Sequence, residues 1–416
     1  MESIPLFTDK KEMVFATVIL LLLFCISLGF EFKSYKNLVS KPLHVSSAKV
    51  LNHYEKHKKN GRSYDVFRLK SDEGYTFYTV LWKKSPIKIG SLVEVKFKTD
   101  KITFLDYLKN FFAVNIFIKS IKKSGNNSIK KLKTYVKNQH KTEDLKELFS
   151  ALFFADFVGK TTRDKIQKIG ISHLVAISGF HLGLISAILY LLLKPLYRFF
   201  QDRFFPYRNI NADLAVIVFT LLFYYMYLID FSPSFLRSFV LSLFSFFLFS
   251  KNIKIISFTT LLFSVSFIVI LLPRFIFSIS FWFSVAGVFY IFLFLKHFSN
   301  ISKIWIFVLL NFWVFIAMMP VVHFVFTTFT PLQLYSPFLS MAFVVFYPME
   351  LLLHILGSGG LFDVWLKKLL NLQTTFYVVM TPLWFLVLYL FFSFISIFNK
   401  WLAIFTLIFS FSIYFI

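Results

Sequence analysis

The feature that most constrains this chain is a series of apolar segments, each close to the length that crosses a lipid bilayer. Ten of them can be marked, at residues 13–30, 170–193, 211–230, 233–250, 254–272, 275–295, 304–322, 332–356, 376–397 and 401–416. A soluble domain keeps roughly a quarter of its residues charged, whereas here 16% are charged and 57% are hydrophobic. The sequence therefore predicts a polytopic α-helical membrane protein with about ten transmembrane helices.

The first apolar segment is interpreted as a retained membrane anchor, assigned to residues 1–30. A cleavable signal peptide would end in small residues, but this run ends at Phe30 and Phe32. The single cysteine, Cys25, lies inside it, so no intrachain disulfide can form. Near the other end of the chain, Pro331, Pro337 and Pro348 could mark broken or re-entrant helices.

The short loops carry a strong charge asymmetry. If the N-terminus is cytoplasmic, the loops on the inner side hold Lys10, Lys11, Lys194, Arg198, Arg203, Arg208, Lys251, Lys254, Lys296, Lys303, Lys367 and Lys368. The outer short loops hold only Arg274 and Lys400. This bias of twelve to two is a strong positive-inside signal and predicts that the N-terminus lies in the cytoplasm.

The stretch between the first two apolar segments is basic and polar. Residues 31–141 contain 25 Lys and Arg against 8 Asp and Glu, so they hold +17 of the formal charge of +24. The predicted topology places this stretch outside, against its charge, although long translocated domains largely escape the positive-inside rule. A·T-rich coding would produce the same excess of lysine, so selection for basicity stays open.

The basic stretch divides into a predicted domain at 31–118 and a basic linker at 119–142, followed by the polytopic domain at 143–416. Strands are expected at 43–52, 64–70, 75–82 and 92–98, with a turn at 70–74. The length and the strand spacing favour a small extracytoplasmic β-barrel of the OB type.

Barrels of this kind bind single-stranded nucleic acid by combining a basic groove with aromatic stacking platforms. The residues of both kinds proposed to bind DNA are Tyr54, Lys56, Lys58, Lys59, Arg62, Tyr64, Tyr75, Tyr78, Trp82, Lys83 and Lys84. The alternative for each is a core aromatic or a solvated lysine. The linker could track phosphates or lie on membrane lipids.

No enzymatic motif is found. Gly159, Lys160 and Thr161 match the end of a phosphate-binding P-loop, but Phe154 occupies the position of its first glycine. His53 and His57 fall in a predicted strand and turn, where a spacing of four does not present both to one metal. We therefore predict no nuclease, no ATPase, no metal and no cofactor.

The most informative segment is GISHLVAISGFHLGL, residues 170–184. Gly179 and Gly183 form a small-residue face that lets a neighbouring helix approach. His173, Ser178 and His181 place polar groups at membrane depth, where they line pathways or bond between helices.

This segment also carries a resemblance. HLVAISGFH resembles the HLLAISGLH signature of the ComEC-type competence channels, which import single-stranded DNA through the bacterial inner membrane during natural transformation. Asp156 matches an upstream GlyAsp pair, with Ala155 in place of glycine. SPSFLRS at 232–238 is similar to a PSxxRA element, and FSISF at 277–281 is similar to FQLSF.

The resemblance covers residues 143–345 and implies a short form, without the C-terminal metallo-β-lactamase-like domain of long members. It implies single-stranded DNA, a periplasmic DNA receptor and a cytoplasmic ATPase or helicase as partners, and a homo-oligomer stays open. The residues that it suggests for the DNA path are Asp156, His173, Ser178, Gly179, His181, Gly183, Arg237 and Ser280. Arg237 is the preferred phosphate contact, its alternative being an interface anchor.

Two other functions remain. A small-molecule or ion transporter predicts proton-relay carboxylates within the spans, and Glu350 alone lies well inside one. A membrane scaffold would use the OB-like domain to bind protein.

Overall fold

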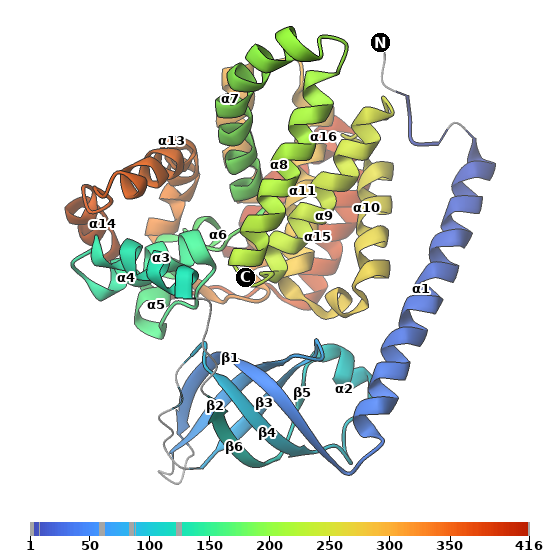
Figure 1. The fold of residues 1–416 in the computed structure, drawn as a ribbon. Coiled ribbons are helices and arrows are strands. Elements are labelled where there is room, and N and C mark those ends of the chain that lie inside the picture. The colour runs from blue at the N-terminus through green and yellow to red at the C-terminus, as the bar shows by residue number, and fades with distance from the viewer. Residues whose placement is uncertain are drawn as a thin grey trace. The chain divides into compact units, whose positions relative to one another are not determined.

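The computed structural model describes residues 4–7, 9–57, 63–82, 87, 89–121 and 127–414. The chain divides into two compact units (Figure 1). Unit 1 comprises residues 1–6, 131–264 and 280–416, and unit 2 comprises residues 7–130 and 265–279.

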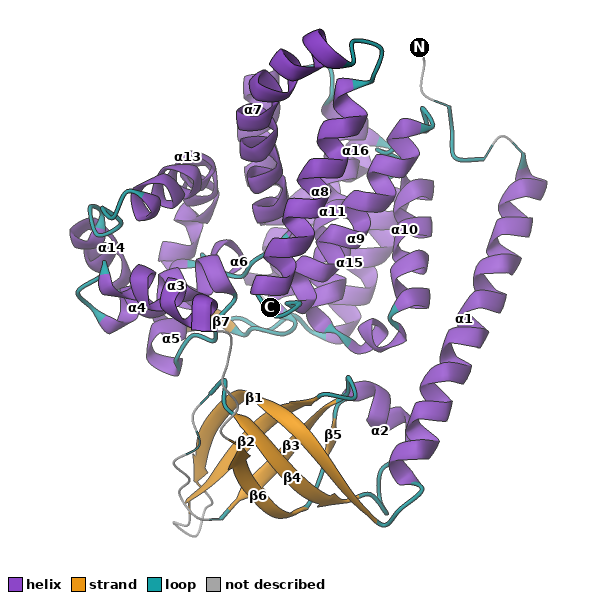
Figure 2. Cartoon of the chain, viewed as in Figure 1, coloured by secondary structure: helices purple, strands orange, loops and turns teal. Residues whose placement is uncertain are grey.

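Unit 2 combines a long helix with a six-stranded sheet, drawn in orange in Figure 2. Its elements are α1 (Lys10–Val39), β1 (Leu43–His57), β2 (Ser63–Ser71), β3 (Thr76–Leu81), β4 (Leu92–Lys98), α2 (Phe104–Lys109), β5 (Phe111–Phe112), β6 (Asn115–Ile121) and the 3-10 helix η1 (Pro273–Phe277). The four strands predicted from the sequence are confirmed, and β5 and β6 are additional.

The strand order is β5-β3-β2-β1-β4-β6, and all neighbours are antiparallel except β3 and β5. β5 pairs with β3, and β6 pairs with β4, at opposite edges of the sheet. Because β5 and β6 follow each other along the chain, the segment 111–121 joins the two edges. The predicted domain boundary at residue 118 is three residues short of the end of β6.

Alternation of apolar and polar residues explains how the sheet forms its core. Val93, Val95 and Phe97 on β4 are fully buried, whereas Glu94 and Lys96 between them are partly exposed. Period-two burial of this kind is typical of a strand with one face in the core. Phe77 of β3 packs against Phe97, with ring centroids 4.8 Å apart.

Arg274 of η1 forms the most connected polar contact of unit 2. Its guanidinium donates hydrogen bonds to the Glu31 carboxylate, at 2.8 Å, and to the Tyr107 hydroxyl, at 2.6 Å. It also donates to the carbonyl of Gly74 at 2.8 Å and covers the Tyr107 ring. The loop before α11 thereby contacts α1, α2 and the turn before β3.

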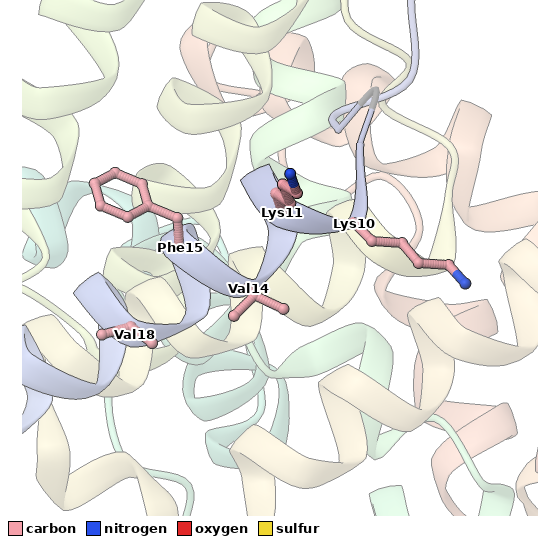
Figure 3. A pocket seen from close by; sticks show the side chains of 5 residues that line it. All are labelled: Lys10, Lys11, Val14, Phe15 and Val18. Atoms are coloured by element: carbon pink, nitrogen blue, oxygen red, sulfur yellow. The ribbon is translucent and has the colours of Figure 1, made fainter.

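The helix α1 has 30 residues, which corresponds to about 45 Å and exceeds the hydrocarbon thickness of a bilayer. Its first turns expose Val14 and Phe15, with Lys10 and Lys11 at the helix start (Figure 3). Near its other end, Leu38 is buried in the core of the sheet. The predicted anchor therefore continues past residue 30 and ends in the β domain.

Unit 1 is almost entirely helical. Its elements are α3 (Asn127–Asn138, from residue 131), α4 (Glu143–Phe154), α5 (Lys160–Ile169), α6 (Ser172–Val175), α7 (Gly179–Phe204), α8 (Ile210–Leu228), α9 (Pro233–Ser250), α10 (Phe258–Leu271, up to residue 264), α11 (Ile279–Phe298, from residue 280), α12 (Lys303–His323), β7 (Thr328–Phe329), η2 (Pro331–Tyr335), α13 (Ser336–Ile355), α14 (Asp363–Leu370), β8 (Tyr377–Val378), α15 (Leu383–Ile395), α16 (Lys400–Ser410) and η3 (Phe411–Tyr414).

Seven helical segments in the described residues are long and apolar enough to cross a membrane, and three shorter apolar helices accompany them. At most 22% of the residues in the most apolar part of any long span are buried. Side chains this apolar and this exposed need a lipid environment, so the chain is a membrane protein.

The predicted helix at 170–193 is wrong at its start. The chain forms the short helix α6 and then leaves helical geometry at residues 176–178. The next helix, α7, begins only at Gly179 and continues through Pro195 to Phe204.

Half of the stretch predicted as a basic linker, 119–142, is helical, because α3 occupies residues 127–138. Val136 of α3 belongs to a buried cluster with Phe149 and Phe153 of α4. Lys133 pairs with Asp156 at 2.5 Å. The basic stretch contains an amphipathic pattern, so its apolar side can pack against α4 as a helix.

Both ends of helix α13 contact the same block of helices. At its beginning, the Ser336 hydroxyl donates to the carbonyl of Gly170 at 3.0 Å. At its end, the Gln139 side chain donates to the carbonyl of His354 at 3.1 Å. Both ends therefore contact the block formed by α3–α6, although the length and composition of the segment are those of a membrane span.

Ala155 ends α4 in the left-handed region, at φ 54°. Its N–H donates to the carbonyl of Ala151 at 3.1 Å, as a helix C-terminus in this conformation requires. The competence resemblance implies glycine here, and the geometry supplies the physical reason.

We expect Ala155→Gly to raise the free energy of unfolding by about 1 kcal/mol, because glycine avoids the left-handed penalty of an L residue. The measurement is denaturant unfolding of the purified protein in detergent, followed by tryptophan fluorescence. Ala151→Gly, in the same helix, is the control and should lower stability by about 1 kcal/mol. Equal stability of Ala155→Gly and wild type would contradict this explanation.

Candidate nucleic-acid interface

The signature segment forms a break between two helices rather than a continuous span. Ser178 precedes α7 with extended backbone geometry, and Gly179 is its first residue. A Cβ at Gly179 would lie 3.2 Å from Oγ of Ser238 on α9, so glycine permits the close approach of the two helices. A Cβ at Gly183 would meet nothing within 4 Å, so only the first glycine of the pair has this role.

His181 is fully buried in the first turn of α7. Its Nδ1 accepts a hydrogen bond from the backbone N–H of Ser178 at 3.2 Å, so the neutral ring carries its proton on Nε2. The ring packs edge-on against Tyr347 and Phe343 of α13, with centroids 5.0 and 5.4 Å apart. His181 therefore joins the helix break to α13.

Arg237 lies in the first turns of α9 and is only 5% exposed. Its guanidinium donates to the hydroxyl of Ser280 at 3.2 Å and to the hydroxyl of Ser234 at 3.4 Å. A further bond goes to the Ser280 carbonyl at 3.5 Å. The structure therefore brings together two residues proposed for the DNA path, Arg237 and Ser280.

The beginnings of three helices meet through these contacts. Gly179 connects α7 to α9, and Arg237 connects α9 to the first turn of α11. A helix N-terminus carries a partial positive charge and backbone N–H groups that favour anions. Arg237 adds a buried positive charge to this junction.

Two further path candidates contact other helices. His173 of α6 is exposed and forms a hydrogen bond with Ser340 of α13, between Nε2 and Oγ at 3.1 Å. Asp156 follows α4 and is paired with Lys133. This ion pair connects α3 to the end of α4. Asp156 therefore has a structural contact that the sequence did not predict.

In unit 2, one face of β1, β2 and β3 mixes aromatic and basic side chains. Lys56 is opposite Tyr64 in the register of β1 and β2, and Arg68 is opposite Tyr78 in that of β2 and β3. Residues paired in this way project from the same face. The Lys56 ammonium lies over the Tyr54 ring, 5.8 Å from its centroid.

This face, which we call the aromatic face, consists of Tyr54, Lys56, Tyr64, Arg68, Tyr78 and Trp82. Trp82 is 62% exposed, and its ring is 5.4 Å from that of Tyr64. Arg68 lies over the Tyr78 ring and was not selected from the sequence. Phe112 of β5, opposite Tyr78 and exposed, was also missed; only the strand register identifies both.

Tyr75 does not fit the proposed stacking role, because it is 1% exposed in the core of the sheet. Burial raises the pKa of its hydroxyl to about 12. Five basic candidates lie outside the described residues, namely Lys58, Lys59, Arg62, Lys83 and Lys84. In the sequence, Lys58, Lys59 and Arg62 lie between β1 and β2, and Lys83 and Lys84 follow Trp82.

Comparison with known proteins gives one match. A family model described as Competence protein matches residues 155–416, which is more than half of the chain. The chain belongs to the competence protein family. No curated protein and no solved structure matches it.

The competence match includes all three blocks that meet at the junction of α7, α9 and α11. The aromatic face lies outside the matched residues, so its role depends on its geometry alone. Among the described residues, no three His, Cys, Asp or Glu side chains form a group that could hold a metal ion.

We expect the double variant Tyr54→Ala/Trp82→Ala to bind single-stranded DNA about tenfold or more weakly, since stacking contributes about 1 to 3 kcal/mol per base. The measurement is fluorescence anisotropy of a labelled oligonucleotide with full-length protein in detergent, at several salt concentrations. Phe117→Ala is the control, because this exposed residue is paired with β4, away from the aromatic face. Unchanged affinity in the double variant, or equal loss in the control, would contradict the assignment.

Proposed function

We propose that this competence-family protein is a channel that imports single-stranded DNA across the bacterial inner membrane during natural transformation. The observation that carries the proposal is the junction of three helix N-termini around Arg237, built from the three matching sequence blocks. A DNA strand brings one negative charge per nucleotide, so its entrance needs cations or oriented N–H groups.

The β domain would receive the strand before it reaches the junction. We interpret the sheet as an OB-type barrel, because the segment 111–121 joins its two edges and three adjacent strands carry the aromatic face. Exposed rings would stack on bases while Lys56 and Arg68 attract phosphates. The partners proposed are a periplasmic DNA receptor, a cytoplasmic ATPase or helicase and membrane lipids.

Contacts within each unit support the proposed sidedness. Ile4 pairs with the loop after α9, accepting a hydrogen bond from Lys254 N–H at 2.8 Å. Both segments belong to the side predicted as cytoplasmic. Arg274, predicted outside, contacts Glu31 next to the β domain.

One contact requires a revised topology after α12. His297 at the end of α11 donates to the carbonyl of Ser396 at 2.8 Å, although the original assignment placed these residues on opposite sides. If α13 does not cross the membrane, this conflict disappears. Lys400 then joins the inner group, while Lys367 and Lys368 join Arg274 outside.

The revised assignment keeps the charge bias. The inner group loses two lysines and gains one, giving eleven, and the outer group becomes three. The positive-inside rule is therefore still satisfied. In this topology the junction of α7, α9 and α11 lies at the outer side, where DNA would arrive.

Deleting the gene should abolish natural transformation while imported DNA still accumulates outside the inner membrane. The measurements are transformant counts and the recovery of labelled DNA from the periplasm and cytoplasm, with the complemented strain as control. Normal transformation of the deletion strain would overturn the proposed function.

Arg237→Ala should lower DNA entry into the cytoplasm by about 10- to 100-fold at unchanged protein level, since a hydrogen bond to a charged group is worth about 1.5 to 3 kcal/mol. Arg237→Lys keeps the charge and should retain part of the activity. Arg198→Ala, which removes an exposed arginine at the other end of α7, is the control. Loss of the Arg237→Ala protein from the membrane would instead assign this arginine to folding.

A further inference from the structure

Four titratable side chains form a continuous line in unit 1. Oδ1 of Asp363 lies 2.8 Å from Nδ1 of His140, and Nε2 of His140 lies 2.9 Å from Nε2 of His354. Nδ1 of His354 lies 3.3 Å from Oε2 of Glu350. The line runs from the start of α14, through the turn after α3, to the interior of α13.

Exposure falls along this line. The Asp363 side chain is 13% exposed, whereas the side chains of His140 and Glu350 are 0% exposed and that of His354 is 4% exposed. Asp363 therefore provides contact with solvent, and Glu350 is the buried end.

The hydrogen-bond partners fix where protons sit. Nδ1 of His354 lies 2.7 Å from the carbonyl oxygen of Glu350, which can only accept, so this nitrogen carries a proton. One proton must also lie between the two Nε2 atoms. If His140 donates its Nδ1–H to an ionised Asp363, the two rings together hold three protons and one positive charge.

Asp363 and His354 flank His140 on its two ring nitrogens. The Lys141 N–H donates to the other Asp363 oxygen at 3.3 Å. Burial lowers the pKa of His140, although Asp363 opposes this effect. His354 lies between His140 and the Glu350 carboxylate, whose two buried oxygens accept no hydrogen bond from the described residues.

The packing holds both rings in place. Phe149 stacks on His140 with centroids 4.2 Å apart, and Phe153 meets His354 edge-on at 4.9 Å. A Cβ at Gly359 would lie 2.6 Å from the His354 ring, so glycine makes this arrangement possible. A relay needs such fixed geometry, because proton transfer requires hydrogen-bond distances.

We propose that Glu350 is a buried proton-binding site that exchanges protons with solvent through His354, His140 and Asp363. A proton that enters at Asp363 Oδ1 passes to Nδ1 of His140 as the Nε2–H of His140 passes to Nε2 of His354, so that the two rings together hold three protons. Loading then breaks the Nδ1–H bond of His354 and forms an O–H bond on Glu350, leaving two neutral rings. Unloading reverses these steps.

Other titratable groups on the neighbouring elements set the background charge. They are Lys133 and Tyr135 of α3 with Asp156 after α4, Tyr347 of α13, His181 of α7, His323 of α12 and Lys367 of α14. Lys133 and Asp156 neutralise each other at 2.5 Å. Tyr347, one turn before Glu350, contacts His181, so the proton site lies next to the helix break of the signature segment.

The inference goes beyond the proposed import of DNA and does not depend on it. It is tested on the purified full-length protein in detergent, by infrared difference spectra between mildly alkaline and mildly acidic buffer. We expect the C=O stretching band of a protonated carboxylic acid that is lost in Glu350→Gln. Glu143→Gln, which changes an exposed glutamate of α4, should retain the band.

The relay itself is tested by transferring the acidified protein to heavy water. The carboxyl band should shift more slowly in His140→Gln and in Asp363→Asn than in wild type, because both changes interrupt the path to solvent. Size-exclusion and thermal unfolding profiles matching wild type establish that the variants are folded. A band that persists in Glu350→Gln, or exchange that is equally fast in both relay variants, would overturn the proposal.

Discussion

A lipid bilayer offers no hydrogen-bond partner to a polar group, and this constraint governs the membrane unit of the protein. Serines and threonines in the apolar helices donate to the carbonyl one turn earlier, as Ser186 does to Leu182 and Ser264 does to Thr260. Buried tyrosines bond across helices, as Tyr389 does to the carbonyl of Ala317. Hydroxyl groups such as these are satisfied within the chain, so the outer faces of the helices can be apolar.

The same constraint makes the break before α7 informative. Leaving helical geometry frees backbone groups that lipid cannot satisfy, so a break must bring its own partners. Here Nδ1 of His181 accepts the N–H of Ser178, and Gly179 allows α9 to approach. The signature residues therefore first serve to build a stable helix start, and the phosphate contact that we propose lies at the positive end of that helix.

The β domain and the membrane unit use charge differently. In the β domain, basic residues on the aromatic face lie beside exposed rings, an arrangement suited to a flexible anionic polymer. In the membrane unit, the charges near the signature segment are buried or paired, as with Arg237 and Ser280 and with Lys133 and Asp156. The charged residues of the chain are therefore of two kinds. Some lie exposed on the aromatic face, and others are held in contacts inside the membrane unit.

The sequence by itself determined the membrane class, the presence of many apolar helices, four strands of the β domain and the family, because hydropathy and period-two alternation are local properties. It could not locate the start of α7 or separate core Tyr75 from exposed Trp82, since both depend on packing against distant segments. The sequence also did not predict that both ends of α13 contact the α3–α6 block, or that Asp363, His140, His354 and Glu350 form a line. Their long-range contacts join residues 166 to 223 positions apart, and only tertiary contacts decide which distant polar groups share a buried site.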